Sequence, residues 1–257
     1  VICEELAKLG DDDGRKLGAM KVIPADVFAS RDAIPRRSCK DEGPTPQVDA
    51  SELPEGAKIL FFSQRWLTPS PRSAATPDDA EGTKYKQIVA SCSAYAELNS
   101  IDENNIYIWL DFSSVDQDDD DELIKGVNSL ALYVCSSDAF ISIDHADYFN
   151  RGWCLMECMF ADAAKAPRYT LTKDNELKPM DINMRLECKV PAEGSFTVES
   201  DREIMKVLES MAVMITMRLD RGITFNGVSE YKEQGSKKLS GDVGGELAGS
   251  SKKATTA

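Results

Sequence analysis

The stretch DAFISIDHADYFNRGWCLMECMF, residues 138–160, decides the fold that we expect for this chain. It begins with an apolar, β-branched segment that predicts a buried strand, and it continues through a polar loop rich in Asp and Asn. From Gly152 or Trp153 onward, good helix formers replace β-branched residues. The stretch therefore predicts a strand, a loop and a helix in direct succession.

Glu157 is the unusual residue of this predicted helix, because apolar side chains surround it. Two interpretations are open. A structural carboxylate would be stabilised by the helix dipole or by Arg151 or Lys165. A reactive carboxylate would lie at the rim of a cleft, where the strands of an open α/β sheet end and helices begin. Spacing alone favours the structural interpretation, because ion pairs outnumber active sites.

Strands and helices alternate along the rest of the chain. The further strands that we predict are residues 58–63, 106–111, 169–172 and 185–190. The further helices are residues 83–99, residues 123–134 and a long helix from a capping box at Ser200 to Leu219. This alternation predicts an α/β fold with a short parallel sheet and helices on both faces.

The length of 257 residues is enough for one domain with extensions. We expect an N-terminal extension or linker at residues 1–57 that packs on the domain, and an α/β domain at residues 58–222. Residues 223–257 are rich in Gly, Ser and Lys and contain few large apolar residues, so we expect a disordered tail.

Charge and cysteine content exclude several classes of protein. The formal net charge of −14 argues against binding to nucleic acid or to an anionic membrane surface, and no apolar run approaches the length of a membrane span. Seven cysteines at loose spacing predict reduced thiols in a cytoplasmic protein. Cys154 and Cys158 lie one helical turn apart, but the chain has a single histidine, so we expect no metal site.

The loops after the predicted strands should gather at one edge of the sheet, where open α/β sheets bind ligands. The residues that we expect at this edge are Ser63, Gln64, Arg65, Trp66, Asp111, Ser113, Asp116 and Glu157. They offer a cation, an aromatic ring, hydroxyls and carboxylates.

The predicted loop at residues 112–122 carries a run of acidic side chains. These side chains would repel a diphosphate if they faced a pocket, but they would be favourable at the N-terminus of the following helix. The spacing of Asp116, Asp118 and Asp120 resembles the start of an EF-hand. Asp121 and Val127 occupy the positions of the required glycine and of the closing glutamate, which excludes a calcium loop.

Taken in order, these motifs resemble those of TIR domains. The matching elements are Phe62-Ser63 at the end of the first strand, Asp111 before the acidic loop, and the Trp-Cys-x-x-Glu sequence at residues 153–157. The stretch YIWLDFSSVDQDD, residues 107–119, also resembles the W-[IV]-D-x-x-C-I-x-Q-D box of heterokaryon-incompatibility (HET) domains, with Ser114 in place of its cysteine. The likeness covers residues 58–172.

The resemblance implies a flavodoxin-like three-layer fold with five short parallel strands, in a signalling protein. In enzymatic TIR domains the glutamate of this motif cleaves the bond between nicotinamide and ribose in NAD, and that role falls here on Glu157. A carboxylate beside the ribose can stabilise the oxocarbenium-like state of this cleavage. NAD is then a substrate, and no cofactor is expected. The residues expected to bind it are Ser63, Arg65, Trp66, Asp111, Ser113 and Trp153.

Two alternative functions stay open. Many TIR domains are non-enzymatic adaptors that self-associate, and catalytic ones also assemble, so we expect a homo-oligomer in either case. An enzyme of the nucleoside deoxyribosyltransferase type also uses a glutamate on this kind of fold. The residues themselves have ordinary alternatives, in which Trp153 anchors the core, Arg65 forms an ion pair and Ser63 makes a hydrogen bond at a strand end.

Overall fold

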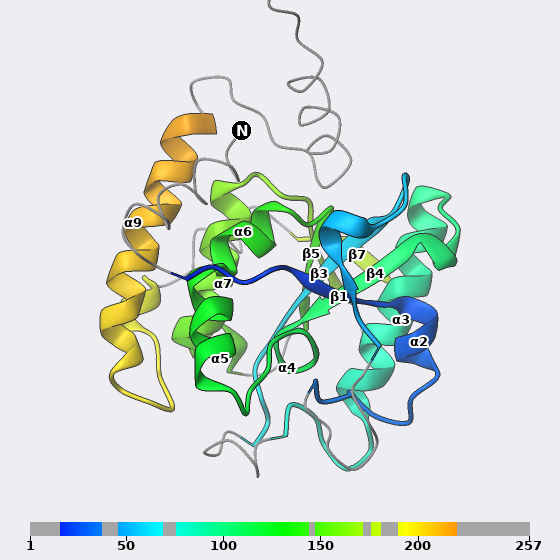
Figure 1. The fold of residues 1–257 in the computed structure, drawn as a ribbon, viewed down its shortest axis with the longest axis horizontal. Helices are drawn as coiled ribbons and strands as arrows, with labels where there is room; N and C mark the ends of the chain where they lie inside the picture. The colour runs from blue at the N-terminus through cyan, green and yellow to red at the C-terminus, as the bar shows by residue number, and fades with distance from the viewer. Residues whose placement is uncertain are drawn as a thin grey trace, which may run out of the picture.

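A seven-stranded sheet forms the centre of the molecule (Figure 1). The structure is a computed structural model that describes residues 16–37, 46–68, 76–143, 147–171, 176–180 and 190–219. The strands are β1 (Lys21–Pro24), β2 (Val48–Asp49), β3 (Lys58–Gln64), β4 (Ile106–Leu110), β5 (Ala139–Ile143), β6 (Arg168–Leu171) and β7 (Leu177–Pro179). They lie in the order β2-β1-β4-β3-β5-β6-β7.

The four central strands, β4, β3, β5 and β6, are parallel to one another. All residues of β4 and β5 are buried, which explains their continuous apolar sequences. The chain order reverses at β3, because β4 pairs on one side of it and β5 on the other. The carboxyl end of β3 is therefore the point in the sheet where a ligand site is expected.

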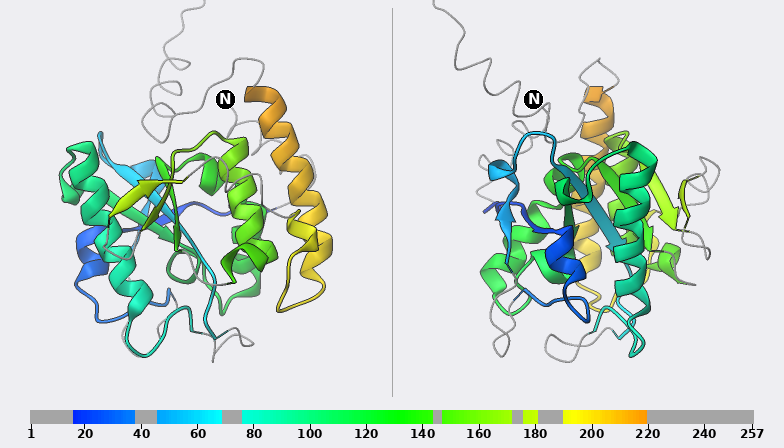
Figure 2. Two further views of the ribbon diagram at one scale, coloured as in Figure 1. Left: turned by 180° about the vertical axis from the view of Figure 1, so that it is seen from behind. Right: turned by 90° about the vertical axis from the view of Figure 1, so that its right-hand side faces the viewer.

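Helices cover both faces of this sheet, as the views in Figures 1 and 2 show. On one face lie α2 (Ala25–Ala29) and α3 (Thr83–Asn99). On the other lie α6 (Leu130–Cys135), α7 (Gly152–Ala163) and α9 (Asp201–Leu219), with α9 outermost against α7. The short helix α4 (Asp111–Ser114) follows β4, and α5 (Asp120–Asn128) precedes α6. No helix in the described parts of the chain is both long and apolar enough to cross a membrane.

Alternation along the strands divides the core into two layers of side chains. Phe61 of β3 points toward α7 and stacks on Trp109 at 4.2 Å and on Phe140 at 5.4 Å between ring centroids. Leu60 and Phe62 point the other way and pack with the apolar face of α3. Ser63 follows the parity of Phe61, so its side chain lies on the face that α7 covers.

Most of the predicted central elements are confirmed. The structure has strands at residues 58–64, 106–110, 139–143 and 168–171, and helices at residues 83–99, 152–163 and 201–219. The predicted α/β class is confirmed as a mixed α/β fold with a mostly parallel sheet. The edge strands differ from the predicted parallel arrangement, because β1, β2 and β7 are antiparallel to their neighbours. Strands of two to four residues are too short to show a clear hydrophobic period.

Two predictions around residue 120 are wrong. The segment predicted as a loop at 112–122 contains α4 and the start of α5, and the helix predicted at 123–134 is two helices that meet at Ser129. Acidic residues promote α5 because the Asp119 side chain accepts a hydrogen bond from Glu122 N and caps the helix. The strand predicted at 185–190 falls mainly on residues outside the description, and the predicted tail at 223–257 lies entirely outside it.

The residues before position 58 were expected to pack on the domain as an extension. Their described parts do more, because β1 joins the main sheet through β4 and β2 pairs with β1. Ala50 N also donates to Met20 O at 2.9 Å. The N-terminal residues thus extend the sheet on the β4 side.

Gly152 begins α7 where two other segments leave no room for a side chain. A Cβ atom at this position would lie 2.0 Å from Cζ of Phe196 and 2.3 Å from its Cε1. Gly152 N donates to Ser195 O at 3.1 Å, and Ser195 N donates to Asn150 O at 2.7 Å. The start of α7 is therefore fixed by residues 195 and 196.

We expect Gly152→Ala to destabilise the protein by about 1–3 kcal/mol, because the added methyl group must displace the Phe196 ring. Urea unfolding measures this loss. The control is Ser93→Ala on the exposed side of α3, where a change within about 0.5 kcal/mol is expected. Equal stability of Gly152→Ala and the parent chain would contradict the close packing at this position.

Candidate functional site

The candidate site is centred on Glu157 in the second turn of α7. The residue is 8% exposed and lies among buried apolar side chains of its own helix. Its Oε2 atom accepts a hydrogen bond of 2.5 Å from Ser63 Oγ. Ser63 is fully buried near the end of β3, so this bond joins the central strand to α7.

Tyr148 extends this pair into a longer buried chain of hydrogen bonds. It lies in the 3-10 helix η4 (Tyr148–Asn150) just before α7 and is fully buried. Its hydroxyl is 2.5 Å from Ser63 Oγ and 3.4 Å from Cys158 Sγ. The sequence offered a weak signal for Tyr148, since it and Phe149 are aromatic residues in a mainly polar loop, but we predicted no role for it.

Asp111 provides a second carboxylate at the same edge, at the first residue of α4. Its Oδ2 accepts from Trp66 Nε1 at 2.7 Å and its Oδ1 accepts from Phe112 N at 2.7 Å. The Trp66 ring meets the Phe112 ring edge-on at 5.3 Å between centroids. Two segments that follow β3 and β4 are thus joined through the Asp111 carboxylate.

Burial makes the Glu157 carboxyl a weak acid. Its pKa rises to about 8, first because burial penalises the charged form and second because the Asp111 carboxylate is nearby. The hydrogen bond from Ser63 opposes this rise. The pKa of Asp111 is also raised by burial, against the opposing effects of Phe112 N and Trp66. At neutral pH, Glu157 is therefore mainly protonated.

The cationic side chain of Lys84 interacts with the Asp111 carboxylate, and Arg65 in turn interacts with Lys84 and Arg151. Lys84, in the first turn of α3, is 2% exposed and donates to Arg65 O. Burial lowers the pKa of Lys84 to about 8. The positive charge of Arg65 also lowers this pKa, whereas the interactions with Cys154 and Asp111 raise it. The pKa of Arg151 is lowered by burial, and Arg65 adds to that effect. Arg65 therefore interacts electrostatically with cations on both sides of it.

The burial of Lys84 could not be predicted from the sequence, because a lysine near the start of an amphipathic helix normally faces solvent. Gln64 is the other polar group that burial makes unusual, at 6% exposure. Within the described residues its amide nitrogen and oxygen make no hydrogen bond, although the amide lowers the pKa of Asp111. A buried amide in this state can bind water or a polar ligand group.

The structure brings six of the residues expected at this edge to it, namely Ser63, Gln64, Arg65, Trp66, Asp111 and Glu157. Arg65 also pairs with Asp147 at 2.9 Å. Ser113 and Trp153 lie elsewhere. Ser113 Oγ donates to Pro35 O at 2.6 Å, and the Trp153 indole donates to Asp201 of α9 at 2.9 Å. Trp153 is half-buried against the core, as its structural alternative predicted.

Two side chains of the acidic run have structural partners, one at the start of α5 and one in an ion pair with an arginine. Asp119 caps α5, and Asp118 forms an ion pair of 2.7 Å with Arg36. Asp116 Oδ1 accepts from Asp118 N at 2.9 Å. No group of three metal-binding side chains occurs in the described parts of the chain.

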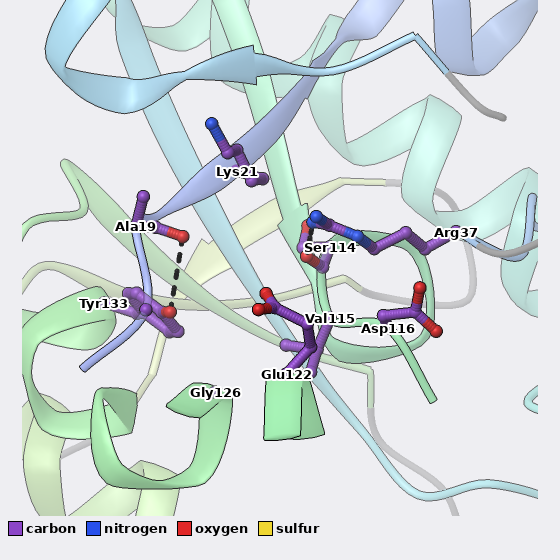
Figure 3. A pocket seen from close by; sticks show the side chains of 10 residues that line it. Ala19, Lys21, Arg37, Ser114, Val115, Asp116, Glu122, Gly126 and Tyr133 are labelled. Atoms are coloured by element: carbon purple, nitrogen blue, oxygen red, sulfur yellow. Dashed lines mark hydrogen bonds between the residues drawn. The ribbon is translucent and has the colours of Figure 1, made fainter. Parts of the chain in front are cut away.

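A separate pocket of about 60 Å³ lies among β1, α4, α5 and α6 (Figure 3). Figure 3 shows Arg37 and Lys21 on one side of it and Glu122 on the other, with the Tyr133 hydroxyl directed to Ala19 O at 3.4 Å. Arg37 Nη1 donates to Ser114 O and to Gln47 Oε1, both at 2.7 Å. The pocket shares no lining residue with the Glu157 cluster.

No family model, curated protein or solved structure matches this chain. The arrangement at the end of β3 must therefore be judged on its own chemistry. It holds a buried weak acid in a fixed orientation, a second carboxyl group beside it, and cations that can bind an anionic ligand. Such a set can stabilise a positive charge that develops on a bound molecule.

The pH dependence of stability tests the burial of Glu157. The folded chain keeps this proton up to about pH 8, whereas the unfolded chain loses it near pH 4.5. The free energy of unfolding therefore falls as the pH rises between these values. Glu157→Gln cannot ionise, so relative to the parent chain we expect it to gain stability from pH 5 to pH 8.5, by about 4 kcal/mol.

Urea unfolding at pH 5 and pH 8.5 measures this gain. Lys84 titrates above about pH 8 in the opposite sense, and it does so in both proteins. The control is Ser93→Ala on the exposed side of α3, which changes no ionisable group, so its difference from the parent chain should not depend on pH. A pH-independent difference for Glu157→Gln would show that Glu157 ionises as an exposed group does.

Proposed function

We propose that this chain is a TIR-like domain that hydrolyses the nicotinamide–ribose bond of NAD, with Glu157 as its catalytic residue. The observation that carries the proposal is the buried Glu157 carboxyl, held by Ser63 at the carboxyl end of β3 and placed beside Asp111. The proposal includes a flavodoxin-like three-layer arrangement. The order of the parallel strands, β4-β3-β5-β6, supports it because such folds bind ligands where the strand order reverses.

The charge of the substrate fits a carboxyl group of raised pKa. The nicotinamide ring of NAD is cationic, so its binding beside Glu157 would favour the ionised carboxylate. As the bond from ribose C1′ to the ring nitrogen breaks, its electron pair leaves with neutral nicotinamide and positive charge spreads over the ribose. The Glu157 carboxylate would stabilise that charge. Water then adds at C1′ and loses a proton, which gives ADP-ribose.

The surrounding groups supply the remaining requirements of this substrate. Arg65 and Arg151 are half-buried cations that could meet the diphosphate, and Trp66 offers an aromatic face. The acidic run that would repel a diphosphate is instead engaged with α5 and Arg36. Direct substrate binding by Ser113 and Trp153 stays a prediction, although their hydrogen bonds lead away from Glu157.

A second candidate function is self-association without catalysis, in a cytoplasmic adaptor. The outer side of α9 favours it, because several large apolar residues are exposed there. They are Ile204, Val207, Val213, Met214 and Met217. Exposed apolar surface of this kind marks interaction sites, and a homo-oligomer is compatible with either function. The acidic charge makes nucleic acid an unsuitable partner.

We expect the purified chain to release nicotinamide from NAD, and Glu157→Gln to lower that rate at least 100-fold because the amide cannot stabilise the developing charge. Chromatography at high protein concentration, with and without a crowding agent, measures the product. Below about pH 8 the rate should rise about tenfold per pH unit, as the fraction of ionised Glu157 rises.

Glu97→Gln on the exposed side of α3 serves as the control and should retain full activity. A parallel assay with a free deoxynucleoside and a second base tests for transferase activity of the nucleoside deoxyribosyltransferase type. Absence of nicotinamide release by the folded parent chain under every condition would leave the self-association function as the better account.

A further inference from the structure

Tyr148 is a buried polar group that the proposed reaction does not use directly. Its hydroxyl connects Ser63 on β3 with Cys158 on α7, and Ser63 in turn donates to Glu157. Four side chains from three elements therefore form one hydrogen-bonded chain. In order, they are Cys158, Tyr148, Ser63 and Glu157.

The direction of the protons in this chain follows from the charge of Glu157. An ionised carboxylate has no proton to donate, so Ser63 must donate its single proton to Glu157. Ser63 then has none left for Tyr148, and the short contact between them requires Tyr148 to be the donor. The Cys158 thiol completes the chain by donating to Tyr148. Every O–H and S–H dipole then points toward the carboxylate.

The same chain can run in the opposite direction when Glu157 is protonated. Glu157 then donates to Ser63, Ser63 donates to Tyr148, and Tyr148 donates to the weakly accepting Cys158 sulfur. Only hydroxyl rotations separate the two arrangements. Hydrogen bonds aligned toward a charge are stronger than bonds between neutral groups, and they polarise one another. The Tyr148 hydroxyl therefore stabilises the charged arrangement more than the neutral one.

We propose that Tyr148 is a positioning residue whose hydroxyl directs the Ser63 proton onto Glu157 and so favours the charged carboxylate that the reaction requires. This inference rests on the proposed function of Glu157. Tyr148 acts through Ser63 and touches no substrate. Because it is fully buried between β3 and α7, its ring also holds the hydroxyl in place, with the Phe149 ring edge-on at 4.9 Å between centroids.

Several other charged or titratable groups act on this chain or its immediate neighbours. They are Asp111 of α4, Lys84 of α3, Arg65 after β3, Arg151 and Cys154 at the start of α7, Asp201 of α9 and Arg168 of β6. Tyr148→Phe removes one hydroxyl and leaves each of these groups in place. A change in the ionisation of Glu157 can then be assigned to the hydroxyl.

The test is a ¹³C NMR titration of the glutamate carboxyl groups in the full chain, from pH 5 to pH 10.5. The Glu157 resonance is identified as the one that Glu157→Gln removes. We expect Tyr148→Phe to raise the midpoint of this resonance by about one pH unit. Tyr133→Phe is the matched control, because its hydroxyl is directed to Ala19 O and is not part of this chain of hydrogen bonds, so it should leave the midpoint unchanged.

An unchanged midpoint in folded Tyr148→Phe overturns the proposal. If that variant fails to fold, 3-fluorotyrosine at position 148 decides the question, because it keeps the ring and makes its hydroxyl a stronger donor to Ser63. The midpoint must then fall below that of the parent chain, and an unchanged value again overturns the proposal.

The rate of nicotinamide release provides a second readout. Tyr148→Phe should be about tenfold slower than the parent chain at pH 7 and nearly equal to it at pH 10, because the profile moves with the Glu157 midpoint. An equal loss at both pH values would indicate a purely structural role and overturn the proposal. If the parent chain releases no nicotinamide, the proposed function fails, while the NMR titration still decides the role of Tyr148.

Discussion

The hydrogen bond between Ser63 and Glu157 is the contact on which the candidate site depends. It joins the strand at the centre of the parallel sheet to the helix that covers one face, inside a region that excludes water. Only because β3 lies between β4 and β5 can Ser63 be this deeply buried at a strand end. The surrounding apolar core makes the carboxyl group costly to ionise, and this cost raises the pKa of Glu157.

Charged side chains that lie far apart in the sequence interact with one another at the end of β3. Asp111 and Glu157 disfavour each other's charge, while Lys84 favours that of Asp111. Arg65 disfavours the charges of Lys84 and Arg151. A ligand that carries both a cationic ring and an anionic group would relieve both kinds of repulsion. This arrangement of charges is therefore electrostatically complementary to a molecule of mixed charge.

Much of the central fold could be predicted, because β3, β4 and β5 are continuous apolar runs and α3 has a clear period. The short antiparallel edge strands could not, since their pairing depends on the sheet and not on their own sequences. For the site, the Trp-Cys-x-x-Glu sequence indicated Glu157. Lys84 and Tyr148 were missed because only the tertiary structure buries them. Substrate binding by Ser113 stays a prediction, and α4 directs its hydroxyl toward Pro35 O.

The contacts at the start of α7 have a mechanical consequence. Gly152 is held by Ser195 and Phe196, Arg151 donates to Thr197, and Trp153 donates to Asp201 at the first residue of α9. These contacts connect α9, the outermost helix, and the segment that precedes it to the first turn of α7. If a partner bound to the exposed apolar side of α9 and shifted this helix, the shift would move α7 through these contacts and so change the position of Glu157. If the chain assembles through α9 as proposed, assembly would therefore affect the position of the Glu157 carboxyl group.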